Sequence, residues 1–167
     1  MDVALVALGA ILVTYGWYWG GVTESRTTAY ALGAFSFMLG LGFAFGSAGS
    51  DVVAASMVSF AAVFGFLAAA NAWNESAQDR TFGMFALLFA IVSFFGYMYF
   101  TDVNAPGQYS YAALVAGVVF ALIFISSALV HHNRGFKQLV GWITLGAGVV
   151  FIWFGFAEAL GNGLDPL

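Results

Sequence analysis

The chain has 167 residues, of which 62% are hydrophobic and 7% are charged, and its formal net charge is −4. A soluble domain carries about 25% charged residues, so this composition excludes a soluble globular protein and indicates an integral membrane protein that contacts lipid. The absence of cysteine excludes disulfides, a thiol nucleophile and the usual structural zinc sites, and the acidic balance argues against nucleic acid as a partner.

Six apolar segments are each long enough to cross a membrane as a helix, which takes about 20 residues. In chain order they cover residues 3–20, 29–46, 52–73, 82–100, 109–130 and 139–160. The connectors between them are short, so we expect one domain over residues 1–167, an all-α bundle of six transmembrane helices. A membrane β-barrel is not expected, because its strands would appear as alternating segments of about ten residues.

The cations indicate how this bundle is oriented. All four of them, Arg26, Arg80, Arg134 and Lys137, lie in or beside the connectors that follow the first, third and fifth segments. The positive-inside rule places these connectors in the cytoplasm and therefore both termini outside. The first segment has no cationic region before it and is interpreted as a span, not as a cleaved signal peptide. The expected location is the cytoplasmic (inner) cell membrane.

The side chains within the spans are neutral. No Asp, Glu, Lys, Arg or His lies near the middle of a segment, which argues against a proton-driven pump and against an enzyme. Tyr15 and Asn71 lie within spans, and Asn74 follows one helical turn after Asn71. An amide needs hydrogen-bond partners that lipid does not offer. Two interpretations remain open for the amide pair: contact between helices, or the lining of a water-accessible path.

Aromatic residues add to this pattern. Phe120 and Phe124 are four residues apart and share one helix face, whereas Phe64 and Phe66 cannot share one. Neutral amides and stacked rings together suit a narrow pore for a small, flat, uncharged polar solute, because rings restrict size and amides replace hydrogen bonds to water.

Two further features concern the connectors and the contacts between helices. His131 and His132 stand beside Arg134, and they form either a solvated helix end or a weak pH-sensitive gate. The pairs Gly16–Gly20 and Gly42–Gly46 have the spacing that lets helices approach closely in lipid, and we expect them to serve packing.

Three stretches resemble the AmiS/UreI family of urea and short-chain amide channels. LGAILVTYGWYWGGVTESRTTA is similar to that family's first helix end and the start of its second span. Phe64-Gly65-Phe66 followed by Asn74 resembles its F-G-F…N spacing, and Asp79–Phe85 resembles the turn and helix start that come next. Ala147 stands where the family has glutamate.

The resemblance implies six spans with both termini outside, and a hexamer with one pore in each protomer. It also implies that Phe66, Phe120, Phe124 and Trp153 line the conduit. With the residues chosen on their own chemistry, the predicted pore-lining set is Tyr15, Phe64, Phe66, Asn71, Asn74, Phe120, Phe124 and Trp153.

The sequence therefore predicts a passive channel for urea, short amides or a similar small neutral solute. Its expected partners are membrane lipids, that solute and further copies of itself, with no cofactor and no metal. Two alternatives stay open. The first is a packing or accessory subunit of a larger membrane complex. The second is an acetate-type monocarboxylate transporter, because Arg80-Thr81-Phe82-Gly83 resembles the Asn-Thr-Phe-Gly motif of the acetate uptake family.

Overall fold

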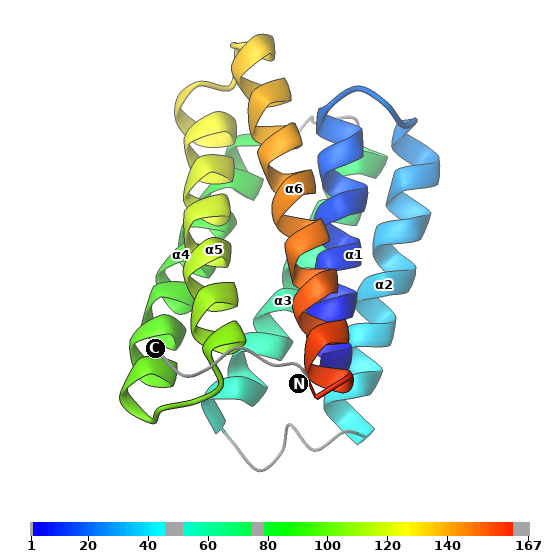
Figure 1. Cartoon of the computed structure of the whole chain (residues 1–167). Coiled ribbons are helices and arrows are strands. Elements are labelled where there is room, and N and C mark those ends of the chain that lie inside the picture. The colour runs from blue at the N-terminus through cyan, green and yellow to red at the C-terminus, as the bar shows by residue number, and fades with distance from the viewer. Residues whose placement is uncertain (1, 46–51, 75–78, 162–167) are drawn as a thin grey trace.

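The structure is a computed structural model that describes residues 2–45, 52–74 and 79–161, and it is all-helical over these residues (Figure 1). A short π-helical stretch, η2, continues the fifth α-helix. The elements are α1 (Asp2–Trp19), α2 (Ser25–Phe45), α3 (Val52–Trp73), α4 (Asp79–Asp102), α5 (Gly107–Phe124), η2 (Ile125–Leu129) and α6 (Arg134–Ala159).

The six predicted helical segments are confirmed as helices, although five of them begin one to five residues earlier than predicted, such as α2 at Ser25 instead of residue 29. α4 begins at Asp79 instead of residue 82, and α6 begins at Arg134 instead of residue 139. The prediction followed apolar residues alone, whereas a helix can continue through its polar end, and an acidic residue in the first turn is stabilised by the helix dipole. The predicted end of the second segment, residue 46, lies outside the described residues.

Among the described residues, four helices are long and apolar enough to cross a membrane, and this marks the chain as a membrane protein by length and composition. These spans are Ala55–Trp73, Asp79–Asp102, Gly107–Leu129 and Arg134–Ala157. The first helix is apolar as well but shorter, over Ala4–Trp19.

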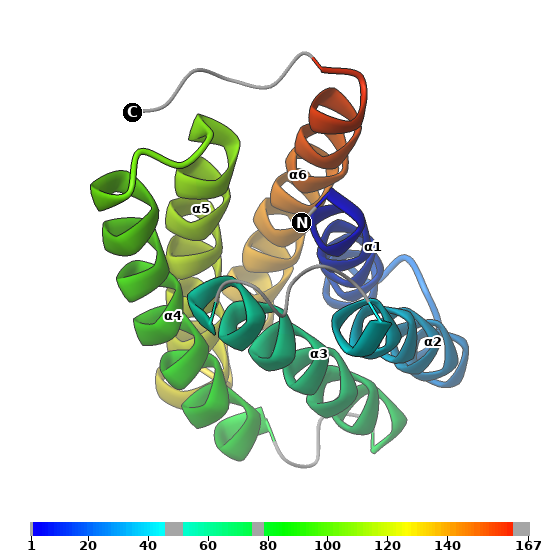
Figure 2. The same cartoon turned by 90° about the horizontal axis from the view of Figure 1, so that it is seen from below.

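The helices form a closed ring in sequence order, in which each helix contacts its neighbours along the chain and α6 returns to α1 (Figure 2). α1 and α3 also touch across the ring. The start of α1 and the end of α6 lie at the same end of the bundle (Figure 1). Side chains of α1, α3, α4 and α5 fill the centre.

Glycines bring α1 and α6 into backbone contact. A Cβ atom added at Gly148 would lie 2.7 Å from the carbonyl oxygen of Gly9, and one at Gly16 would lie 2.7 Å from that of Gly141. No real side chain tolerates such distances, so only glycine allows this approach. The expected packing role of Gly16 agrees with this contact, whereas Gly46 lies outside the described residues.

Candidate functional site

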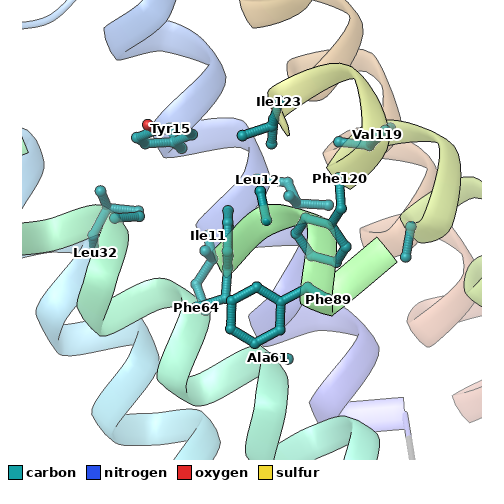
Figure 3. Packing of buried hydrophobic residues seen from close by; sticks show 14 of the residues in the cluster. Ile11, Leu12, Tyr15, Leu32, Ala61, Phe64, Phe89, Val119, Phe120 and Ile123 are labelled. Atoms are coloured by element: carbon teal, nitrogen blue, oxygen red, sulfur yellow. The ribbon is translucent and has the colours of Figure 1, made fainter. Parts of the chain in front are cut away.

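A cluster of aromatic rings occupies the centre of the bundle (Figure 3). Phe64 of α3 is fully buried at its middle. Its ring centroid lies 4.6 Å from that of Phe120, 5.3 Å from Phe89, 5.4 Å from Phe82 and 6.2 Å from Tyr15. Most of these pairs are tilted or edge-on, which is the favourable geometry for aromatic contacts. Four helices therefore meet at one ring cluster, which closes the interior at this level.

An apolar cavity of about 60 Å³ lies on the side of the ring cluster toward the start of α1. Its wall comes from all six helices and includes Leu8, Ala61, Phe89, Ala112, Phe120 and Phe151. Phe89 and Phe120 thus belong to both the cavity wall and the ring cluster. The cavity ends where the rings begin.

A polar cluster lies on the opposite side of the rings. Asn71 follows Phe64 by two helical turns on the same face of α3 and is 4% exposed. Its Nδ2 donates hydrogen bonds to the Tyr15 hydroxyl at 3.3 Å and to Oδ1 of Asp79 at 3.3 Å. Its Oδ1 is buried and has no hydrogen-bond partner among the described residues. A buried acceptor without a donor is rare and costly, so this oxygen is a candidate contact for a solute.

An ion pair joins this polar cluster to α6. Lys137 Nζ lies 2.6 Å from Oδ2 of Asp79, and both side chains are mostly buried. The same ammonium lies 5.0 Å from the centroid of the Trp19 ring, a cation–π contact. Asp79 thereby accepts from both Asn71 and Lys137, and the carboxylate and ammonium neutralise each other beside the amide.

Four of the eight predicted pore-lining residues come together here. Tyr15, Phe64, Asn71 and Phe120 are all buried and lie in the ring cluster or in contact with it. Phe124 is partly buried and packs against the same core. Tyr15 and Asp79 lie on other helices, so the two bonds of the Asn71 amide are of the kind that the first of its two interpretations, contact between helices, expects.

The other three predicted residues do not join the cluster. Phe66 is 49% exposed and Trp153 is 67% exposed, so both lie on the outside of the bundle. Asn74 is exposed at the end of α3. Two residues along a helix turn the side chain by roughly 200°, which is why Phe64 points inward while Phe66 points outward.

Sequence reasoning did not single out Phe82, Phe89, Asp79 or Lys137 as site residues. A signal for the two rings was present, because Phe82 and Phe89 are seven residues apart and share a helix face, as do Phe64 and Asn71. The charged pair lay in connectors, where a charged residue is ordinarily solvated.

The π-helical stretch η2 lies against the start of α4. A Cβ atom added at Gly83 would lie 2.9 Å from Cβ of Ser127 and from the backbone nitrogen of Ala128. The hydroxyls of Ser126 and Ser127 are buried without a hydrogen-bond partner among the described residues. π-Helical turns inside α-helices are frequent at functional sites. Polar atoms without partners thus occur on both α3 and η2 at this end of the bundle.

Within the described part of the chain, no three His, Asp or Glu side chains lie close enough together to hold a metal ion. No protein-family model matches the sequence, and no curated protein matches it. The site's own geometry therefore carries the functional argument.

Proposed function

We propose that this protein is a six-span channel that conducts urea, short amides or a similar small neutral solute passively across the cell membrane. In this proposal the cation-bearing end faces the cytoplasm and both termini lie outside. The positions of the cations support this orientation, because Arg26, Arg80, Arg134 and Lys137 all lie at the starts of α2, α4 and α6, which share one end of the bundle.

The observation that carries the proposal is the buried Oδ1 of Asn71, which lacks a donor just beyond the ring cluster. Urea and amides carry N–H groups that can donate to this oxygen and recover a hydrogen bond lost on leaving water. Acetate as the carboxylate has acceptors only, so the same oxygen disfavours it. The nearby ammonium of Lys137 is already paired with Asp79 and is poorly available to attract an anion.

The rings provide the second element of the proposal. A solute coming from the apolar cavity meets Phe89 and Phe120 first and then Phe64. Closely packed rings form a hydrophobic constriction, so conduction requires one of these side chains to turn aside. Small, flat molecules need the smallest opening, which favours urea over bulkier neutral solutes.

Assembly into a ring of copies is part of the proposal, with six copies implied by the resemblance to urea channels. In such an assembly the exposed aromatic residues Phe66 and Trp153 would contact lipid or a neighbouring copy and would not line the route through one protomer.

One observation favours the alternative of an accessory subunit. Both described hydrogen bonds of the Asn71 side chain go to residues of other helices, Tyr15 of α1 and Asp79 of α4. An amide used in this way can serve solely to hold helices together in lipid. The two functions differ in one measurable property, which is solute flux.

Stopped-flow light scattering of proteoliposomes tests the proposal. Vesicles containing the purified protein and protein-free vesicles are mixed with urea, with acetamide, or with sodium acetate at a pH well above the pKa of acetic acid. Protein-dependent flux of urea and acetamide without flux of acetate supports the channel. Flux of acetate alone would support the monocarboxylate carrier, and no protein-dependent flux would leave the accessory subunit.

A further inference from the structure

A second pocket lies outside the ring cluster, at the cation-bearing end of the bundle. Its volume is about 320 Å³, and it lies between the end of α1 and the start of α6. Its lining includes Tyr18 and Trp19 of α1 together with His131, His132, Arg134 and Lys137. The proposed solute route does not require these histidines or Arg134.

The charge of the pocket is one-sided. The whole chain has four residues that are Lys or Arg, and two His residues. Two of those four, Arg134 and Lys137, line this pocket together with both histidines. No Asp or Glu occurs among its described lining residues. Of the described carboxylates, Asp79 pairs with the lining residue Lys137, and Glu24 lies three residues after the lining residue Gly21.

Arg134 is the cation of this pocket that remains available to bind an anion. It is exposed and makes no ion pair among the described residues, whereas Lys137 is bound to Asp79. Arg134 also begins α6, a helix of 26 residues, and the N-terminus of a helix adds positive potential. The Asn133 side chain already accepts a hydrogen bond from the N–H of Phe136 in this first turn. The rings of His131 and His132 lie 3.8 Å apart beside it, and each imidazole offers at least one N–H donor in either ionisation state.

We propose that this pocket binds a phosphate group. Arg134 supplies a planar donor fork that suits phosphate oxygens, and the two histidines supply further donors. Tyr18 and Trp19 give an apolar, aromatic flank for whatever carries the phosphate. A pocket at the end of a membrane-spanning bundle is reached both by lipid headgroups and by soluble phosphates, which share this chemistry. The inference holds whether or not the interior conducts a solute.

The test compares Arg134→Gln with Arg80→Gln in the full chain, purified in a phosphate-free neutral detergent. Both substitutions remove one exposed cation from the same end of the bundle, but Arg80 does not line the pocket. Calorimetric titration with inorganic phosphate, against sodium chloride at matched ionic strength, measures the soluble ligand. Native mass spectrometry of protein loaded with phosphatidylglycerol or phosphatidylcholine measures the lipid.

We expect the wild type and Arg80→Gln to bind equally, and Arg134→Gln to bind at least roughly tenfold more weakly, as for the loss of one charged hydrogen bond. His132→Gln, a second variant at the rim, is expected to weaken binding in the same direction. If the wild type retains phosphatidylglycerol selectively and Arg134→Gln does not, the ligand is a lipid headgroup. If only inorganic phosphate binds, the ligand is a soluble phosphate. Absence of both in the wild type, or equal loss in Arg80→Gln and Arg134→Gln, would overturn the inference.

Discussion

The side-chain amide of Asn71 in α3 donates a hydrogen bond to the hydroxyl of Tyr15 in α1 across 3.3 Å. The contact spans the helix ring, because α1 and α3 are not neighbours in sequence order. Tyr15 also touches Phe64 and Phe82, so this bond connects the polar cluster to the rings. The amide nitrogen of Asn71 thus has hydrogen-bond partners, whereas its oxygen has none among the described residues.

Replacing Asn71 by leucine removes the proposed solute acceptor together with the bonds to Tyr15 and Asp79. We expect protein-dependent urea flux to fall strongly and the free energy of unfolding to drop by about 1–3 kcal/mol, because the remaining partners lose their donor. Tyr15→Phe removes only one of the two bonds and should reduce stability less. Stopped-flow flux and thermal unfolding in detergent measure both effects.

The matched substitution is Asn74→Leu, since Asn74 is an exposed amide at the end of the same helix. Its effect on urea flux should be small. An equal loss of flux in both variants would show that the amides act at the channel mouth and not through the buried oxygen of Asn71.

The glycine contact between α1 and α6 predicts a position-specific effect on stability. Gly148→Ala places a methyl group against the backbone of Val13 and Gly9 and should destabilise the fold by about 1–3 kcal/mol through overpacking. Gly146→Ala, two residues away in the same helix, faces open space and should be neutral or slightly stabilising because alanine favours the helix. Thermal unfolding of the two variants decides, and equal melting temperatures would contradict the contact.

The ion pair between Asp79 and Lys137 predicts energetic coupling. Lys137→Met keeps the apolar stem and removes the charge, so it leaves the mostly buried carboxylate of Asp79 without its ammonium. A double-mutant cycle with Asp79→Asn should give a coupling energy of about 1–3 kcal/mol, between the values of surface and fully buried pairs. Additive losses would mean that the 2.6 Å pair contributes nothing beyond its separate side chains.

The helices could be predicted from sequence because their apolar runs are long and their connectors short. The burial of Asn71 followed from the same reasoning, since lipid offers an amide no partner. Its pairing with Tyr15 did not follow, because that contact depends on how the ring of helices closes. Closure in turn depends on the pairs Gly9–Gly148 and Gly16–Gly141. The two glycines of each helix are seven residues apart, but the sequence does not show that these two helices pack against each other.

The candidate site was predictable only in part. Helical periodicity separates Phe64 from Phe66 but does not say which one points inward, and neighbouring helices decide this through Phe89 and Phe120. The outward position of Trp153 likewise depends on the face that α6 turns toward α1. Charged residues at helix ends appear solvated in a sequence, so the pair formed by Asp79 and Lys137 emerges only from the fold.

The urea permeability of proteoliposomes containing Phe64→Ala, compared with the wild type and protein-free vesicles, tests the central claim most directly. Phe64 lies at the centre of the ring cluster, which is the proposed constriction, so its removal should raise urea flux above the wild-type level and admit larger amides. The control Phe95→Ala removes a ring that is 66% exposed on α4 and should leave flux unchanged. Phe64→Leu is a milder change that can be measured if the alanine variant does not fold. Urea flux no faster than in protein-free vesicles for the wild type and for folded Phe64 variants would contradict the account.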